Sequence, residues 1–365
     1  MKEISTAEDI YKRLFEKNYL MEKYSIRSNI VHKLDDNQPL LSERVTARLE
    51  AVNRNRVVKI VPQHRYNVRL TPSMLNRDGY INASLMEFSD VGQKYILTGI
   101  PSEDKVFAFW QMVLEQRSPT IIQFADNVEE KLEHYDKYFP DKGDVWSYGH
   151  LQVERKSYAI HQGNFHTRNF ILRKGNETHR VLHFTVFGWT ETTTPIMQDF
   201  LALRKVMKDT GALNMINPAS ALFRSTMRRY IHTPPSFAPI IQSARGSSRA
   251  GAFVVIDLLI RMIDGKKTNL YSVEDLIVKC KHMRIHCVPV ALHHSFIYEA
   301  VLDYLLRRNP RFQDFKEPLI AYSESCFVKW SSMDKEIEKF INTKTWFLNE
   351  SSRNKFLRSV MPPVV

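Results

Sequence analysis

The sequence predicts an α/β fold in which helices flank a twisted mixed sheet. Strand-like apolar segments alternate with amphipathic helical segments through one continuous stretch, which is the pattern of a single α/β domain. The chain has 365 residues, of which 43% are apolar and 25% are charged, as in ordinary folded proteins. The best apolar stretch, 252–260, is too short to cross a bilayer and carries Asp257 in its middle. We therefore expect a soluble protein without a transmembrane segment.

The predicted strands are short apolar or alternating segments bounded by turn residues. Residues 120–124 have the pattern of a buried strand, and 238–241 form an apolar strand that leads into a loop rich in glycine and serine. Residues 175–177 (Gly-Asn-Glu) predict a tight hairpin turn. The remaining strands are expected at 57–61, 80–84, 94–98, 150–155, 157–162, 165–172 and 180–187.

The predicted helices show apolar residues at helical spacing. Near the N-terminus, Ser5 is an N-cap residue followed three positions later by Glu8, which is a capping box. A second N-terminal helix is expected from 42 to about 51. Further helices are expected at 106–116, 199–210, 250–262, 272–286 and 294–307.

These elements divide the chain into a central domain and two extensions. We expect 1–52 to be an N-terminal helical extension packed on the domain, 53–310 to be the domain, and 311–365 to be a C-terminal extension. The last segment has enough large apolar side chains to pack on the domain: Trp330, Phe340, Trp346 and Phe347.

The charge and cysteine content narrow the function classes. With 52 basic and 40 acidic residues, the net charge is +12, which favours anionic partners such as phosphorylated or acidic proteins, nucleic acids and anionic lipids. Three cysteines (Cys280, Cys287 and Cys326) cannot form a disulfide framework or a four-thiolate metal site. The N-terminus is charged and lacks a signal-peptide core. We therefore expect a cytoplasmic protein.

The segment 240–251 carries the strongest functional pattern in the sequence. An apolar strand ends, a Gly/Ser loop follows, and a helix begins near Arg249. This layout directs backbone N–H groups and a helix N-terminus to one spot, which is an anion-binding arrangement. Arg249 can fork onto two phosphate oxygens. The alternative is a plain strand–turn–helix corner with a surface arginine.

This segment resembles the signature loop of the classical protein-tyrosine phosphatase domain, which reads His-Cys, five residues and Arg. Here the frame reads Gln242-Ser243, five residues and Arg249. Other segments resemble family motifs in the same order: 53–56, 80–84, 109–113, 115–116, 138–140, 183–184, 189–191 and 298–304. The resemblance implies a protein-tyrosine phosphatase-like fold for 53–310.

Several positions depart from the family pattern. The family uses a cysteine thiolate whose pKa, ordinarily about 8.5, is lowered by the loop. Ser243 holds that position, and Gln242 replaces the preceding histidine. Other departures fall in the general-acid loop (Thr190 and Glu191), at the two water-positioning glutamines (Pro289 and His293), and at the recognition tyrosine and aspartate (Val57 and Lys59). Together they indicate that hydrolysis is no longer maintained.

We therefore expect a pseudophosphatase, that is, an inactive binding module or scaffold for a phosphorylated or acidic protein, such as the phosphotyrosine segment of a protein kinase. A neutral hydroxyl at position 243 repels a bound phosphate less than a thiolate would. The predicted phosphate-binding residues are Ser243, Ala244, Arg245, Gly246, Ser247, Ser248 and Arg249. The predicted pocket rim is Val57, Lys59, Trp189, Glu191 and His293.

Other interpretations remain open. Arg249 could be purely structural, held by a carboxylate such as Glu129. The chain could retain weak phosphatase activity through Ser243 or through a water held by Glu191. Basic stretches at 279–286, 224–229 and 307–311 could form a surface that meets an acidic or phosphorylated protein, or could be solvated helix faces. Arg284 also fits a helix of the family, and this resemblance implies a partly structural role for it. The net charge of +12 could instead favour nucleic acid or anionic lipid, although we do not expect nucleic acid as the partner. We expect no cofactor and no metal, because His293 and His294 lack a further ligand at suitable spacing.

Overall fold

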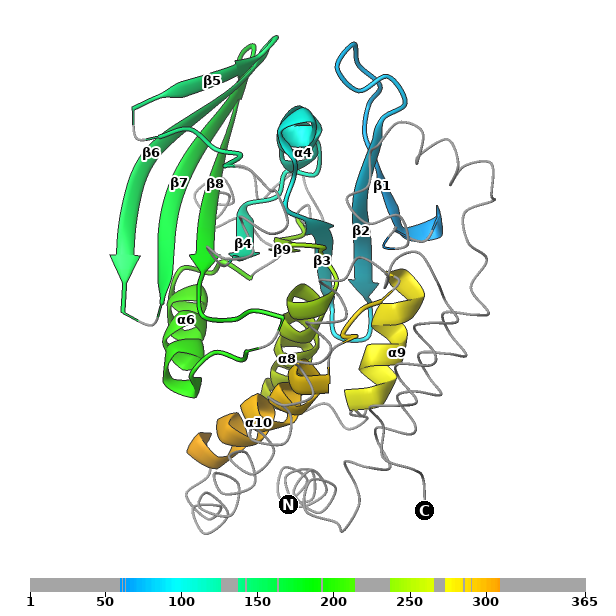
Figure 1. Ribbon diagram of the computed structural model, residues 1–365, viewed down its shortest axis with the longest axis vertical. Coiled ribbons are helices and arrows are strands. Elements are labelled where there is room, and N and C mark those ends of the chain that lie inside the picture. Colours follow the sequence, from blue (N-terminus) through cyan, green and yellow to red (C-terminus); the bar gives the residue numbers. More distant parts are fainter. Residues whose placement is uncertain are drawn as a thin grey trace, which may run out of the picture.

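The structure is a computed structural model. It describes residues 60, 62, 64–125, 137–141, 143–162, 164–191, 193–213, 237–265, 273–284, 286–289 and 291–308. The predicted N-terminal helices, the C-terminal extension, the basic stretch at 224–229, and Val57, Lys59 and Glu129 lie outside the described residues. Within the described residues the architecture is the predicted α/β one (Figure 1), a mixed sheet with helices on both faces.

The described residues form a nine-stranded sheet in the order β1-β2-β3-β9-β4-β8-β7-β6-β5. The four central strands, β3, β9, β4 and β8, run parallel to one another, and the outer pairs are antiparallel. The strands are β1 (Asn67–Arg69), β2 (Tyr80–Phe88), β3 (Gln93–Gly99), β4 (Thr120–Phe124), β5 (Val145–Tyr148), β6 (Leu151–His161), β7 (Phe165–Lys174), β8 (Glu177–Val186) and β9 (Ile240–Ser243).

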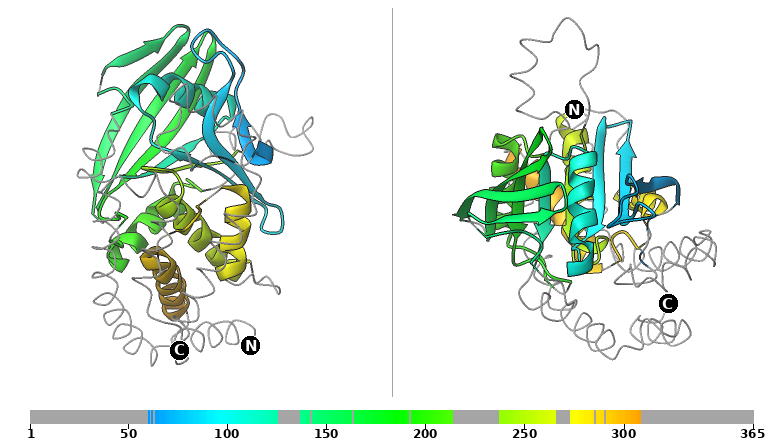
Figure 2. Two further views of the ribbon diagram at one scale, coloured as in Figure 1. Left: turned by 45° about the vertical axis from the view of Figure 1, so that its right-hand side comes forward. Right: turned by 90° about the horizontal axis from the view of Figure 1, so that it is seen from above.

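Helices cover the two faces of the sheet unequally. Helix α4 (Val106–Glu115) lies on one face, whereas α6, α8, α9 and α10 gather on the other (Figures 1 and 2). Their bounds are Met197–Asp209, Ser248–Asp264, Val273–Met283 and Ala291–Arg308. Two short 3-10 helices, η1 (His64–Tyr66) and η2 (Glu103–Lys105), complete the described elements.

The sheet separates two hydrophobic cores, one on each face, because side chains alternate between the faces along the central strands. Successive side chains of a strand point to opposite faces of the sheet. In each pair Ile96/Leu97, Ile121/Ile122 and Ile240/Ile241, the first residue packs in the core that contains α4 and the second in the core that contains α8. Strand β9 is therefore buried on both faces, and its carboxyl end lies at the edge of the parallel strands where ligand sites of α/β sheets form.

Among the predicted elements that the structure describes, most are confirmed within a few residues, and one strand prediction is wrong. The strand expected at 57–61 lies outside the described residues except for Ile60. Residues 150–155 and 157–162 were expected as two strands, but they form the single strand β6. Its pairing with β7 continues through a register irregularity between Arg155 and Ser157. Two short strands, β1 and β5, were not predicted. The hairpin turn at 175–177 is confirmed, with Gly175 at φ +58° and Lys174 paired to Glu177.

Among the helices that the structure describes, none combines the length and the hydropathy needed to cross a bilayer.

Candidate anion-binding site

The candidate site is the turn between β9 and α8. Strand β9 ends at Ser243 and α8 begins at Ser248, so the loop comprises residues 244–247. Gly246 adopts φ +68°, a left-handed conformation that side-chain-bearing residues rarely adopt. A Cβ placed on Gly246 would lie 2.2 Å from the carbonyl carbon of Thr98. The loop is thus pressed directly against the end of β3.

A buried arginine supports the loop from behind. The Arg284 side chain is fully buried, and its guanidinium donates to the carbonyl oxygens of Gly246 and, at 3.2 Å, Arg245. It also donates to Ser84 Oγ at 3.2 Å. Burial lowers the pKa of Arg284 to about 10, so the group stays charged at neutral pH.

The direction of these carbonyls sets the direction of the neighbouring amides. In a trans peptide the C=O and N–H groups point opposite ways. The Gly246 carbonyl faces Arg284, so the N–H of Ser247 points to the inside of the loop. The N–H of Ser248 is among the first donors of α8, which have no partner within a helix. The loop and the positive end of α8 therefore converge on one spot that suits an anion.

Ser243 lies at the base of this loop. Its side chain is fully buried, and its Oγ has no hydrogen-bond partner among the described residues. The preceding Gln242 is held from behind, because its Nε2 donates to the Gly99 carbonyl at 3.3 Å and its Oε1 accepts from the Tyr138 hydroxyl at 2.7 Å. No base therefore contacts the Ser243 hydroxyl in the part of the chain that the structure describes.

The two described cysteines do not take the place of Ser243. Cys280 and Cys287 are both fully buried. Cys287 packs behind the start of α8, where a Cβ on Gly251 would lie 2.4 Å from its Sγ. Burial, together with the neighbouring Cys287, raises the pKa of the Cys280 thiol well above its usual value. Both thiols are thus buried away from the loop surface that a ligand would contact.

Arg249 connects the loop to the segment 189–191. Its side chain is fully buried at the first turn of α8. Nη1 donates to the carbonyl oxygen of Trp189 at 2.8 Å, and Nη2 lies 3.5 Å from Glu191 Oε1. The carboxylate nearest to Arg249 in the described structure thus comes from Glu191, at one end of the predicted site.

His293 makes a second connection to the same segment. His293 Nε2 lies 2.8 Å from the Thr190 carbonyl, and Nδ1 lies 2.8 Å from Ser248 Oγ. Because a carbonyl only accepts, Nε2 carries a hydrogen. A neutral ring then accepts from Ser248 at Nδ1, and a protonated ring donates to it. In both states His293 joins the start of α8 to residue 190.

Threonine side chains shape the segment that contains Trp189 and Glu191. The N–H of Thr190 donates to Thr193 Oγ1 at 3.1 Å, and the N–H of Thr193 donates to Thr190 Oγ1 at 3.0 Å. Trp189 anchors the segment, since its buried indole meets Phe124 and Phe296 edge-on, with ring centroids 4.9 and 5.2 Å apart. These contacts hold 189–191 against Arg249.

The electrostatics of Glu191 follow from this position. Burial alone would raise the pKa of its carboxyl, but Arg249, together with His293 and Arg245, lowers it below its usual value. Glu191 is therefore ionised at neutral pH, beside the arginine that a bound phosphate would use. It is an internal anion next to the Arg249 guanidinium.

The Glu191→Gln variant is expected to bind inorganic phosphate about tenfold more tightly than the wild type at pH 7, because it removes a negative charge beside Arg249. Since the pKa of Glu191 is lowered, the difference should persist from pH 8 down to about pH 5 and shrink only at more acidic pH. Isothermal titration calorimetry measures the affinity for phosphate and its dependence on pH. Glu177→Gln, at the far end of the β7–β8 hairpin, is the charge-matched control. Equal affinities for wild type and Glu191→Gln would contradict the prediction.

The structure brings together most of the residues predicted from sequence. Residues 243–249, Trp189, Glu191 and His293 lie in one site, whereas Val57 and Lys59 lie outside the described residues. Sequence reasoning gave Arg284 a partly structural role, but not its contact with the loop carbonyls. It missed the pairing of Thr190 with Thr193, for which the repeated threonines after Trp189 were the available signal.

Known proteins are similar in sequence to this chain over most of its length. The family model described as protein-tyrosine phosphatase matches residues 51–303. The chain is 33% identical over 345 residues to tyrosine-protein phosphatase non-receptor type eak-6 of Caenorhabditis elegans. The matched region covers 94% of this chain and 85% of that protein. It is 27% identical over 267 residues to human receptor-type tyrosine-protein phosphatase alpha, covering 70% of this chain and 30% of that protein.

Proposed function

Because this chain belongs to the protein-tyrosine phosphatase family, we propose that it works as a pseudophosphatase, a module that binds a phosphorylated protein without hydrolysing it. The observation that carries the proposal is Ser243 at the nucleophile position, buried and without a contacting base among the described residues. A thiol has a pKa near 8.5, which this loop can lower, whereas an unassisted serine hydroxyl stays protonated at neutral pH.

The state of Glu191 also supports the absence of turnover. A general acid has to be protonated near the working pH if it is to give a proton to the leaving group. The Arg249 guanidinium instead favours the ionised carboxylate, which lies 3.5 Å away. His293, at the position of a water-positioning glutamine, is already engaged by Thr190 and Ser248.

The retained features support binding. Arg249 keeps its place at the first turn of α8, and Arg284 holds the loop open from behind. The net charge of +12 favours an anionic partner. The partner we propose is a protein carrying phosphotyrosine, such as a phosphorylated segment of a protein kinase, which the module would hold or shield.

The Arg249→Lys variant is expected to bind a phosphotyrosine peptide about 10- to 100-fold more weakly than the wild type, because an ammonium cannot fork onto two phosphate oxygens. Fluorescence anisotropy with a labelled peptide measures the affinity. Arg180→Lys, an exposed arginine on β8, is the matched control and should bind like the wild type. If wild type and Arg249→Lys bind equally, the loop is not the binding site.

Residual hydrolysis is the second candidate function, favoured by the names of the relatives, which are tyrosine-protein phosphatases. A sensitive assay of phosphate release from an aryl phosphate separates the two functions. Our proposal requires no release above the Ser243→Ala background. Turnover that Ser243→Ala abolishes would replace binding with catalysis as the function.

A further inference from the structure

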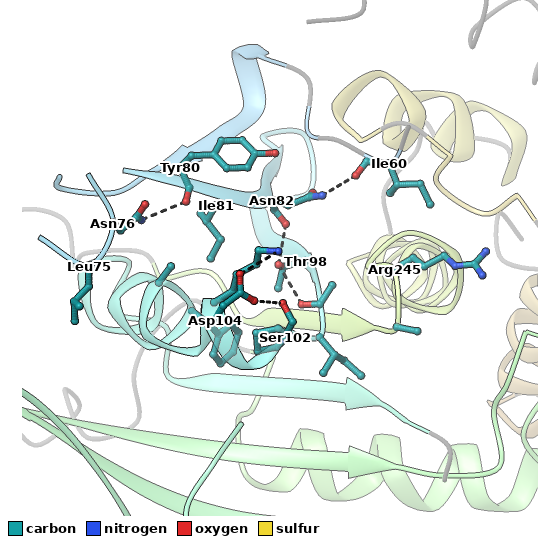
Figure 3. Close-up of a pocket in the computed structure, with 17 residues that line it drawn as sticks. Ile60, Leu75, Asn76, Tyr80, Ile81, Asn82, Thr98, Ser102, Asp104 and Arg245 are labelled. Atoms are coloured by element: carbon teal, nitrogen blue, oxygen red, sulfur yellow. Dashed lines mark hydrogen bonds and ion pairs between the residues drawn. The ribbon is translucent and has the colours of Figure 1, made fainter. Parts of the chain in front are cut away.

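A second pocket lies directly beside the anion-binding loop. We call it the β2–α4 pocket and define it by Ile81, Thr98, Pro101, Ala108, Ala244 and Arg245, which all line it. Its cavity volume is about 300 Å³. Figure 3 shows Leu75 and Asn76 at one end of the pocket, and Ile60 and Arg245 at the other. Because Ala244 and Arg245 belong to both sites, the pocket adjoins the loop.

The size of the β2–α4 pocket limits its ligand. Small-molecule sites typically span about 300–1,000 Å³, so this cavity lies at the lower limit. It has room for one large side chain with its adjoining backbone, rather than for a dinucleotide. A peptide side chain is therefore a better match than a large cofactor.

The polar groups of the lining hold its walls in place. Asn82 Nδ2 donates to the Ile60 carbonyl at 2.7 Å, and Thr98 Oγ1 donates to the Asn82 carbonyl at 2.9 Å. Ser102 Oγ donates to Asp104 Oδ1 at 2.6 Å. These donors are already used within the protein, whereas Ile81, Ala108 and Phe109 contribute apolar surface. Such a lining favours an apolar side chain over a sugar or a polar metabolite.

The rim of the pocket has two unusually exposed apolar side chains. Met74 is 93% exposed, and Leu75, which lines the pocket, is 62% exposed. Both sit in a tight turn in which Ser73 and Asn76 exchange backbone hydrogen bonds of 3.0 and 3.1 Å. A fixed turn that presents apolar side chains beside an apolar cavity is typical of a protein-binding surface.

The charges around the pocket favour an acidic ligand segment. Lys105 and Arg245 contribute two positive charges to the lining, against one negative charge from Asp104. Lys105 Nζ lies 3.7 Å from the Asp104 carboxylate. Arg245 lies at the end of the pocket next to the loop, apart from Asp104 (Figure 3).

We propose that the β2–α4 pocket binds a large apolar side chain that flanks the phosphorylated residue in the protein partner. An acidic residue of the same segment lies beside Arg245, at the end of the pocket next to the loop. This proposal rests on the proposed function, because the loop and Arg249 hold the phosphate while the pocket selects the sequence around it. The site is a specificity determinant, and phosphate alone does not use it.

A set of phosphotyrosine peptides with leucine or alanine at each flanking position tests the proposal by fluorescence anisotropy. The wild type should prefer leucine at one flanking position by about tenfold. The Ala108→Phe variant fills the pocket, so it should lose that preference but keep the affinity of the wild type for free phosphotyrosine. The matched control is Ala202→Phe, a half-buried alanine on α6, on the opposite face of the sheet, and it should keep the preference.

Leu75→Ser is the second variant, because its exposed position makes misfolding improbable as a cause. This variant should bind the preferred peptide about threefold more weakly than the wild type and should bind free phosphotyrosine with unchanged affinity. Binding of free phosphotyrosine without any flanking preference would overturn this proposal and leave the proposed function intact. A preference that survives Ala108→Phe would place the specificity site elsewhere and also overturn it. If neither free phosphotyrosine nor any peptide binds, the proposed function fails and this proposal fails with it.

Discussion

The Gly246→Ala variant is expected to lose about 2–5 kcal/mol of folding free energy and its phosphate binding. Two effects add. The left-handed conformation at φ +68° costs a residue with a Cβ about 1–2 kcal/mol. The new methyl would also lie 2.2 Å from the Thr98 carbonyl carbon and 2.3 Å from the Gly99 nitrogen, and overpacking typically costs about 1–3 kcal/mol. Urea denaturation measures the loss of folding free energy.

The atoms that oppose this methyl cannot move easily. Thr98 and Gly99 end strand β3, and they pair with Gln242 and Ser243 of β9 in the middle of the sheet. We therefore expect the loop rather than the sheet to shift. A shifted loop moves its inward N–H groups away from Arg249, so affinity for inorganic phosphate falls even at temperatures where the variant is folded.

Gly92→Ala separates the two effects. Gly92 has φ +69°, but no atom lies within 4 Å of a Cβ placed on it. This control should lose only the conformational contribution, about 1–2 kcal/mol, and should bind phosphate like the wild type. If both variants lose the same stability and both bind phosphate, the close contact between the loop and β3 does not shape the site.

The sequence predicted those parts of the fold that local patterns determine. The segment expected as a helix at 106–116 is α4 (Val106–Glu115), and the buried strand expected at 120–124 is β4. The prediction of two strands at 150–162 failed at Lys156, where the pairing with β7 passes through a register irregularity between Arg155 and Ser157. Pairing with β7 continues on both sides of that irregularity, and such pairing depends on residues distant in sequence.

In the candidate site, too, the residues of one short segment were predictable from the sequence, whereas the contacts between distant residues were not. The loop and Arg249 are encoded in one short segment, so the pattern identified them. The contact between Arg284 and the loop was harder to predict, because Arg284 lies in a basic stretch that suggests a solvated helix face. In the structure its side chain is fully buried. The contact between His293 and the Thr190 carbonyl joins residues 103 positions apart. The packing of α10 against α8 places His293 beside Ser248, and the contact between Arg249 and Trp189 brings the segment with Thr190 to the same place.

A buried carboxylate fixes the helix that carries the site. Asp257 of α8 accepts from the Tyr95 hydroxyl at 2.6 Å and pairs with Arg261 at 2.7 Å and Arg204 at 3.2 Å. These contacts connect α8 to β3 and to α6. Burial alone would raise the pKa of Asp257, but Arg261 and Arg204 lower it below its usual value. The position of α8, and with it the helix end at Ser248, depends on this network.

The Asp257→Asn variant is expected to lose about 3 kcal/mol of folding free energy at pH 7, because it leaves two arginines without their buried counter-charge. We take the lower end of the usual range, since the Arg204 and Arg261 side chains are 17% and 29% exposed. A carboxylate whose pKa is lowered by folding stabilises the native state above its unfolded pKa of about 3.9, and that contribution disappears as pH falls below it. Urea denaturation from pH 7 to pH 3 should therefore show the wild type and the variant converging at the acidic end. Asp144→Asn, an exposed aspartate before β5, should change stability by less than about 0.5 kcal/mol. A constant difference across the whole pH range would show that the variant acts through packing rather than through the charge of Asp257.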